Sequence, residues 1–320
     1  MISRSGSNIQ GKGDGTMRSR ESRVACLFVL GVLWLANTAA AGSAGQRQSR
    51  STVDDIVTIA NVQAMIDEML TGRRTRTLIP PLTHTYGSFS LGEAYRIQGA
   101  LARRLTRDSG SVAGYKVAYA SKAAQEQFGI PAPASGPLFQ LQRIPSGSVL
   151  EASEFTALII ETEVAFTIGK KIDQPISSIE ALKPHVKWVH ASFDIGSERF
   201  DSRQAKPVVA DQVANGVGAY IFVLGPAMAP SEVDVDALTL RLGVNGRTVA
   251  ESAATNVMGS PWNSLLWLAN QVVDRGDALE PGYVVQTGTA APAYKAEGSK
   301  MLGSYLGDCG PLGKVICAIR

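Results

Sequence analysis

The chain has 320 residues, of which 45% are apolar and 18% are charged, with 32 glycines, 15 prolines and three cysteines. This composition excludes collagen-like, intrinsically disordered and disulfide-dense proteins. The formal net charge of +3 comes from the first 41 residues, because the remaining 279 carry 26 basic and 26 acidic side chains. A neutral chain of this kind lacks the basic surface expected of a protein that binds nucleic acid or anionic membranes.

The first 41 residues are typical of a signal peptide. Three arginines precede an apolar run at 24–36, and three alanines at 39–41 follow it. The arginines are Arg18, Arg20 and Arg23. A charged start, a short apolar segment and small residues at a cleavage site direct a protein to export. We therefore expect an exported protein, periplasmic or secreted, that is cleaved after Ala41.

Two further features of this region bear on the same prediction. Met17 is a candidate start, because residues 1–16 add nothing to the pattern. A permanent membrane anchor is the alternative interpretation, but it requires a longer apolar run. Cys26 lies inside the run rather than at its end, which disfavours a lipoprotein anchor. We expect no stable membrane anchor after processing, and a small, polar linker at 42–52.

The segment 53–110 is predicted to be a helical N-terminal subdomain. Its first helix extends from about 52 to 70, with apolar residues at helical spacing on one face. They are Val53, Ile56, Ile59, Met65, Ile66 and Met69. Three arginines follow, Arg73, Arg74 and Arg76, and we expect them at a solvated helix end, where positive charge matches the helix dipole.

A capping box opens the second predicted helix. Ser90 and Glu93 stand at the N-cap and N3 spacing, at which each side chain accepts a hydrogen bond from the other's backbone. The residues expected to face inward are Ala94, Ile97, Leu101 and Leu105.

After residue 110 the sequence changes to strand patterns. Segments 112–120 and 156–168 are rich in β-branched and aromatic residues. Asn245 and Gly246 separate two further strands, 238–244 and 248–253, as a hairpin turn does. Ser260 and Pro261 begin a helix that runs to about Val273.

Two terminal strands, 283–287 and 314–319, complete this part of the chain. The whole pattern predicts an α+β protein, with a helical N-terminal part and a β-rich catalytic domain at 111–320.

Two cysteines remain after removal of a signal peptide. Cys309 and Cys317 lie on either side of a predicted turn. An exported pair can be oxidised, but a hairpin centred on 310–313 does not place the two residues opposite each other. Their oxidation state stays open at this point.

Several catalytic signatures are missing from the sequence. It has no Gly-x-Ser-x-Gly elbow and no Walker loop. The segment Gly216-Val217-Gly218 lacks the third glycine of a dinucleotide-binding fingerprint. The three histidines are too few for a histidine-rich zinc site, and His190 is more typical of a structural residue than of an active-site residue.

The segment 158–166 holds two glutamates in an otherwise apolar strand. Because side chains alternate along a strand, Glu161 and Glu163 point to the same face. Two neighbouring carboxylates repel each other unless a cation lies between them, and a hard divalent cation is the simplest partner. The other interpretation is a strand with a solvated face. Spacing alone does not separate the two.

Asp194 and Lys116 are single charges in apolar surroundings. Asp194 follows the apolar segment 188–193, as a buried ligand would. Lys116 lies in a β-rich segment, where a buried lysine acts as an acid or base near neutral pH. For Lys116 the pattern alone still favours a solvated face.

Ten short motifs, in family order, carry a resemblance from about Leu91 to the C-terminus. They are Ala94-Tyr95, Gly114-Tyr115-Lys116, Gly136-Pro137-Leu138, Glu161-Thr162-Glu163, Phe193-Asp194 with Arg199, Ala210-Asp211-Gln212, Gly259-Ser260-Pro261, Trp267 to Asn270, Thr287-Gly288-Thr289 and Leu312-Gly313. The chain thereby resembles the 2-keto-4-pentenoate hydratase / 2-oxohepta-3-ene-1,7-dioate hydratase group of the fumarylacetoacetate hydrolase (FAH) superfamily. The fold that this implies is an FAH C-terminal-domain-like mixed β-roll with a helical N-terminal part.

The resemblance also implies a site. It assigns Mg2+ or Mn2+ to Glu161, Glu163 and Asp194, and catalysis to Lys116. The substrate-binding positions that it implies are Ser135, Gly136, Leu138, Arg199, Thr287 and Gly288. The expected partner is a small-molecule 2-keto acid, which chelates the metal and reacts through a stabilised enolate. A homo-oligomer is also implied.

Two positions depart from the family pattern. Asp194 is one methylene shorter than the usual glutamate. Ala134 stands where the family has an aspartate that helps to manage protons, which leaves Lys116 to work with water or with Ser135. The expected function is a hydratase acting on 2-hydroxy-2,4-dienoates or 2-keto-4-enoates, as in aromatic-compound catabolism. The alternatives are a 2-keto diacid (4-oxalocrotonate-type) decarboxylase and an exported oxo-acid binding protein without activity.

Overall fold

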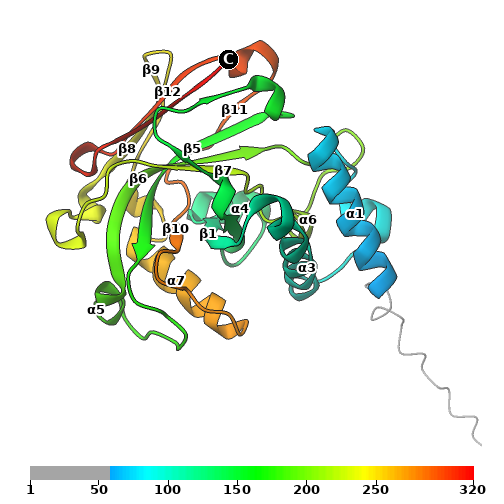
Figure 1. Ribbon diagram of the computed structural model, residues 1–320, viewed down its shortest axis with the longest axis horizontal. Coiled ribbons are helices and arrows are strands. Elements are labelled where there is room, and N and C mark those ends of the chain that lie inside the picture. Colours follow the sequence, from blue (N-terminus) through cyan, green and yellow to red (C-terminus); the bar gives the residue numbers. More distant parts are fainter. Residues whose placement is uncertain (1–57) are drawn as a thin grey trace, which may run out of the picture. The chain divides into compact units, whose positions relative to one another are not determined.

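The computed structural model describes residues 58–320, all of which belong to one compact unit (Figure 1). The predicted signal peptide and linker lie outside the described residues. The helices are α1 (Ile59–Thr75), α2 (Leu82–Tyr86), α3 (Leu91–Ser109), α4 (Lys122–Phe128), α5 (Ile179–Leu182), α6 (Val209–Ala214) and α7 (Pro261–Asp274). Within the described part, no helix has the length and hydropathy needed to cross a membrane.

The larger sheet has eight strands. They are β1 (Val112–Ala118), β2 (Ala134–Phe139), β3 (Arg143–Pro145), β5 (Leu158–Ile168), β6 (Val186–Ser197), β7 (Ile221–Leu224), β10 (Val284–Gln286) and β11 (Tyr294–Ala296). Seven of them follow the order β2-β1-β10-β5-β6-β7-β3, and β11 pairs with β5. The long antiparallel pair β5–β6 forms the centre of this sheet.

The smaller sheet has five strands in the order β4-β13-β12-β8-β9. They are β4 (Val149–Leu150), β8 (Thr239–Val244), β9 (Arg247–Ala253), β12 (Gly303–Asp308) and β13 (Lys314–Ile319). The predicted hairpin is confirmed: Asn245 and Gly246, both with positive φ, connect β8 to β9. The strands on either side of the predicted turn at 310–313 are also confirmed, as β12 and β13, whereas β2, β6 and β7 were not predicted.

The main core lies between the two sheets and α7. One face of β5 supplies Ile160, Val164 and Phe166 to it, and the smaller sheet supplies residues such as Leu240 and Leu242. The predicted helix start is confirmed, because the Ser260 side chain caps the first turn of α7. The face of β5 that packs into this core is the one opposite to its glutamates.

The N-terminal helices share a second core with the end of the larger sheet. Figure 1 shows α1, α3 and α6 grouped together, and their apolar residues, such as Met69, Ile97 and Val213, form this cluster. The capping box of Ser90 and Glu93 at the start of α3 is confirmed. The helical part thus packs directly against the β-rich part through a buried apolar interface.

The first helix differs from its prediction at its C-terminal end. It continues to Thr75, five residues beyond the expected end, so Arg73 and Arg74 lie in its last turn and Arg76 caps it with φ +55°. Arg74 and Arg76 are exposed, as expected. For Arg73 the expectation is wrong, because its guanidinium turns inward and donates to the Asn215 carbonyl at 2.9 Å.

Candidate active site

Three carboxylates meet at the centre of the β5–β6 pair. Glu161 lies directly opposite Asp194, and Glu163 follows two residues along β5. Each of the three residues offers an oxygen atom that lies within 4.8 Å of the others. In the described part of the chain, this is the one group of acidic, histidine or cysteine residues that is arranged to hold a metal ion.

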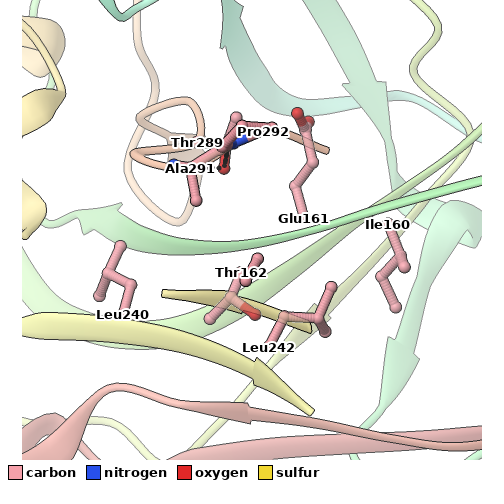
Figure 2. A pocket seen from close by; sticks show the side chains of 9 residues that line it. Ile160, Glu161, Thr162, Leu240, Leu242, Thr289, Ala291 and Pro292 are labelled. Carbon is pink, nitrogen blue, oxygen red and sulfur yellow. Dashed lines mark hydrogen bonds between the residues drawn. The ribbon is translucent and has the colours of Figure 1, made fainter. Parts of the chain in front are cut away.

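The pleat of β5 separates these carboxylates from the main core. Figure 2 shows Glu161 directed to one side of the strand, toward the loop of Thr289 and Pro292, while Thr162 lies on the other side with Leu240 and Leu242. The prediction that Glu161 and Glu163 share a face is confirmed. We call this side of the larger sheet, which carries Glu161, Glu163 and Asp194, the carboxylate face.

Burial makes the carboxylates electrostatically unusual. Burial raises the pKa of Glu161 to about 7, against the lowering effect of Lys116. Burial, and then the charges of Asp194 and Glu161, raise the pKa of Glu163 well above its ordinary value. Glu163 Oε2 accepts a hydrogen bond from the Gly288 amide at 2.8 Å, while Glu163 Oε1 and Asp194 Oδ1 have no partner. Two buried carboxylate oxygens without a hydrogen-bond partner are suitable ligands for a hard divalent cation.

Lys116 is buried and belongs to the carboxylate face. The register runs from Lys116 on β1 through Gln286 on β10 to Ala165 on β5, so these side chains share a face. The Lys116 ammonium forms an ion pair with Asp194. Burial lowers the pKa of Lys116, but the nearby carboxylates raise it, with Asp194 as the largest contributor. The carboxylates have the larger combined effect, so the pKa of Lys116 lies above its ordinary value. The solvated-face interpretation of Lys116 is wrong.

Two residues of this region escaped the sequence analysis. Gln286 is fully buried on the carboxylate face; its Nε2 donates to the Phe193 carbonyl at 2.9 Å, and its Oε1 has no partner. A lone amide in the apolar segment 283–287 was the available signal. Tyr119 has φ +56°, and its ring centroid lies 4.8 Å from that of Phe128. Burial raises the pKa of Tyr119 to about 12, and Lys116 and Glu161 act on it as neighbouring charges. Tyr119 fell inside a predicted strand, and no signal marked it.

The implied substrate positions on β2 fall on both faces of the strand. Gly136 lies opposite Lys116, and Leu138 lies opposite Gly114, so both belong to the carboxylate face. A Cβ atom at Gly136 would collide with the Gly216 carbonyl oxygen, which explains the glycine. Leu138 is buried there in a small apolar cluster.

Ser135 lies on the opposite face of β2. It pairs with Val117, and its hydroxyl forms a hydrogen bond of 2.6 Å with the Gln271 side chain on α7. Arg275 also donates to this hydroxyl. The expectation that the Ser135 side chain helps Lys116 to handle protons is wrong, because the pleat directs the two side chains to different sides of the sheet.

The other implied positions have distinct settings. Gly288 holds Glu163 through its amide, whereas the Thr287 hydroxyl donates to the Val164 carbonyl at 2.9 Å. Arg199 follows the end of β6, is 9% exposed, and lies over the Tyr220 ring, 5.0 Å from its centroid. Of these residues, Gly288 alone contacts a carboxylate of the three-residue group.

Histidine and cysteine take no part in this group. His190 is buried, and its ring nitrogens bond the Gly225 carbonyl and the Thr167 hydroxyl, which supports a structural role. Cys309 and Cys317 are both buried and free. Cys317 lies opposite Tyr305 in the β12–β13 pair, so the expected lack of direct pairing between the cysteines is confirmed.

Residues 112–305, which include β1, β5 and β6, match the protein family described as fumarylacetoacetate (FAA) hydrolase C-terminal. The chain belongs to this family. The FAA hydrolase match confirms the superfamily resemblance drawn from the sequence motifs and the fold class expected from it.

Two proteins with assigned functions are similar to this member of the family over most of their length. It is 27% identical over 233 residues to a 4-oxalocrotonate decarboxylase of Pseudomonas sp. (strain CF600), covering 72% of this chain and 88% of the relative. It is 27% identical over 227 residues to a 2-hydroxyhexa-2,4-dienoate hydratase of Comamonas testosteroni, covering 70% of this chain and 85% of the relative.

A solved structure shares the fold of this FAA hydrolase family member. The 4-oxalocrotonate decarboxylase from Pseudomonas putida G7, complexed with magnesium and adipate, superimposes with a TM-score of 0.77 at 22% identity. The likeness covers 82% of this chain and 99% of that chain. The helical N-terminal part is therefore included in the shared fold.

Proposed function

We propose that the protein is a metal-dependent hydro-lyase that hydrates short 2-hydroxy-2,4-dienoates or 2-keto-4-enoates. The observation that carries the proposal is the grouping of Glu161, Glu163 and Asp194 with Lys116 on the carboxylate face. Relatives named as 2-hydroxyhexa-2,4-dienoate hydratase and 2-keto-4-pentenoate hydratase support the reaction class.

The donor set fits a divalent metal ion. Glu161, Glu163 and Asp194 offer oxygen ligands only, as Mg2+ and Mn2+ prefer, and two of their buried oxygens have no protein partner. Related structures contain magnesium in the decarboxylase and Mn2+ in a fumarylpyruvate hydrolase from Pseudomonas aeruginosa. When bound, a divalent cation supplies Lewis-acid stabilisation of negative charge on a 2-keto acid.

The protein's own groups bind and orient the substrate and transfer protons to or from it. Gly288 fixes the Glu163 carboxylate through its amide, and Gln286 has a buried amide oxygen free for a donor on the substrate. Lys116 Nζ holds the proton that is exchanged with the substrate carbon chain, because it is the one cation in the described structure that forms an ion pair with any of the three carboxylates.

A decarboxylase is the second candidate, and one observation favours it. Ala134 lies opposite Ala118 at the end of β1, on the same face as Lys116, so the carboxylate that the family pattern provides is missing on the carboxylate face itself. A reaction that loses carbon dioxide needs no carboxylate there to direct a water molecule. The similarity to 4-oxalocrotonate decarboxylases points in the same direction. An oxo-acid binding protein without catalytic activity is the third candidate.

One assay tests the three candidates. Ultraviolet absorbance follows 2-hydroxypenta-2,4-dienoate and a 2-keto-hex-3-enedioate, each with Mg2+, with Mn2+ and with a chelator, while released carbon dioxide is measured in parallel. Metal-dependent loss of the dienoate supports the hydratase, and carbon dioxide from the diacid supports the decarboxylase. Absence of both reactions in the wild type, with substrate binding retained, supports the binding protein. Glu163→Gln is the negative control for metal dependence.

Two further proposals concern the protein in its cell. The signal-peptide pattern supports export from the cytoplasm, followed by cleavage. Exposed apolar residues on the outer face of the smaller sheet support a homo-oligomer: Leu306 and Ile316 lie opposite each other on β12 and β13, and Val149 lies beside them on β4. Size-exclusion chromatography with light scattering tests the second proposal, and a monomer at micromolar concentration contradicts it.

A further inference from the structure

Gln286 is a fully buried glutamine on the carboxylate face. It pairs in register with Lys116 on β1 and with Ala165 on β5, so its side chain lies beside that of Lys116. A buried carboxamide normally forms hydrogen bonds through both its oxygen and its nitrogen. In Gln286 only the nitrogen does so, because Oε1 has no hydrogen-bond partner among the described residues. Such an acceptor indicates a donor that a ligand brings.

Two contacts fix the orientation of this amide. Nε2 donates to the Phe193 carbonyl at 2.9 Å and to the Ser192 hydroxyl at 3.4 Å, both on β6. A carbonyl oxygen only accepts hydrogen bonds, so the atom that contacts it must be the amide nitrogen. The side chain thus extends from β10 across β5, the strand that carries Glu163, to β6. Its oxygen is the atom left without a partner.

The other polar side chains of the carboxylate face already have partners or roles. The three carboxylates form the group that suits a metal, and Lys116 is a donor paired with one of them. The Ser192 hydroxyl donates to the Glu163 carbonyl at 3.3 Å. Both ring nitrogens of His190 have hydrogen-bond partners. In the described strands of this face, Gln286 Oε1 is therefore the acceptor that remains for a ligand other than the metal.

The position of Gln286 bears on the carboxylate that is missing at Ala134. β1, which carries Lys116, lies between β2 with Ala134 and β10 with Gln286. Gln286 therefore borders Lys116 from the side opposite to Ala134. A carboxamide oxygen orients a water molecule by accepting a hydrogen bond, as a carboxylate does, although it does not take up a proton.

We propose that Gln286 positions the water that is added during hydration: Oε1 accepts a hydrogen bond from this water and then from the hydroxyl group that it becomes. The inference rests on the proposed function and deepens it. In the ketonised substrate the C3–C4 double bond is conjugated with the 2-oxo group, so the water oxygen bonds to C4 and the electron pair of the double bond moves to C3. C3 takes a proton from Lys116, and Lys116 recovers one from the added water. The Gln286 amide gains and loses no proton.

Two ligands that differ in one hydroxyl group test the acceptor. The separate enantiomers of 4-hydroxy-2-ketopentanoate carry the hydroxyl that hydration creates, and 2-ketopentanoate lacks it. Each is titrated calorimetrically into the Mg2+-loaded protein. We expect one enantiomer to bind the wild type about three- to tenfold more tightly than 2-ketopentanoate does, and Gln286→Met to bind all three acids equally. Equal affinities in the wild type overturn the proposal without any variant.

Kinetics separate the water step from the proton step. Gln286→Met should hydrate 2-hydroxypenta-2,4-dienoate about ten- to a hundredfold more slowly, because the water is no longer oriented. Exchange of the C3 protons of 2-ketopentanoate with D2O needs Lys116 but no addition of water, so it should stay within about threefold of the wild type. Proton NMR on the Mg2+-loaded protein measures this exchange. Equal losses in both reactions indicate a structural role only and overturn the proposal.

Metal binding tests the rival role of Gln286 as a metal ligand, because amide oxygens also bind hard cations. Equilibrium dialysis with Mn2+ should give Gln286→Met the wild-type affinity, and a fall of about tenfold or more would place Oε1 on the metal instead. Gln98→Met is the matched control. Gln98 is also buried, but its nitrogen donates to the Ser135 and Val213 carbonyls at 2.8 Å each. This variant should lose stability and keep the preference for the hydroxylated acid.

The inference and the proposed function fail separately. A wild type that prefers the hydroxylated acid but turns over no dienoate retains the acceptor at Gln286 and rejects the hydratase. A wild type that hydrates the dienoate, with Gln286→Met equally fast, retains the hydratase and rejects the role of Gln286.

Discussion

Lys116 and Asp194 form a buried ion pair although β10 and β5 lie between their strands in the larger sheet. Neighbouring strands are about 4.8 Å apart, so a flat sheet would separate the two backbones by roughly 14 Å. Two side chains lying along a flat surface do not close that distance. The pair exists because the sheet curls around its carboxylate face, which turns four strands into the wall of one site.

Glu163→Gln should weaken metal binding. Glu163 is fully buried and is held by the Gly288 amide, and glutamine keeps the shape but removes the charge. Because the substitution removes a charged ligand, we expect the affinity for Mn2+ to fall at least ten- to a hundredfold. Equilibrium dialysis with Mn2+ measures this. The exposed Glu251→Gln on β9 is the control, and equal affinities for wild type and Glu163→Gln would show that the glutamates do not bind metal.

Lys116→Met should abolish most of the turnover and retain the metal site. Methionine has a similar length but carries no proton, so the rate should fall by about two to four orders of magnitude, as for the loss of a general acid or base. Steady-state kinetics on the active oxo-acid, with the metal content measured in parallel, checks this. If the variant, reloaded with metal, works at the wild-type rate, Lys116 has a structural role only.

Mn2+ affinity should rise with pH up to about 7. Burial raises the pKa of Glu161 to about 7, so below that pH a cation must displace a proton. For each proton displaced, the affinity should fall by up to about tenfold per pH unit below 7, and the raised pKa of Glu163 adds a further proton to displace in the same direction. The raised pKa also means that Glu161 stabilises the metal-free fold at low pH, an effect lost as pH rises toward 7. Dialysis across pH 5.5–8.5 measures the profile; a flat profile contradicts it.

Gly136→Ala should destabilise the fold. A Cβ atom at this position collides with the Gly216 carbonyl, and neither backbone segment can move freely. Forcing an extra carbon into a packed site costs about 1–3 kcal/mol in the free energy of unfolding. Gly92→Ala is the matched control, since its Cβ meets no atom closer than 3.9 Å and lies in α3, where alanine is favoured. Urea denaturation measures both, and equal stability of the two variants would contradict the prediction.

The mature protein should begin at Gly42. The arginines at 18–23, the apolar run and the alanines at 39–41 predict cleavage after Ala41. N-terminal sequencing of the protein from its native host, after cell fractionation, tests this. An intact residue 1 or 17 on soluble cytoplasmic protein would reject export.

Local pattern explains what the sequence predicted well. The hairpin at Asn245-Gly246, the caps at Ser90 and Ser260 and the shared face of Glu161 and Glu163 depend on residues within a few positions of one another. Turn chemistry, capping and the pleat act at this range, so a single sequence contains the information. The family motifs added Asp194 and Lys116 to the candidate site.

Contacts between residues far apart in the chain explain the predictions that failed. The prediction that Arg73 lies at a solvated helix end failed because its hydrogen-bond partner, Asn215, lies 142 residues away in the sequence. No residue near Arg73 in the sequence indicates this partner. Ser135 was assigned to Lys116 although one residue of register on β2 directs its side chain to α7 instead. Strand register and the packing of α1 are properties of the assembled sheet, which no local pattern records.

The sequence by itself determined that this is an α+β chain with two carboxylates on one strand face and a family resemblance that names their chemistry. The tertiary structure alone decided how Asp194 and Lys116 reach them, that Gln286 and Tyr119 belong to the same region, and that Arg73 bonds the Asn215 carbonyl. The physical reason is the curvature of the larger sheet, because side chains that alternate along single strands become neighbours only when several strands close around one face.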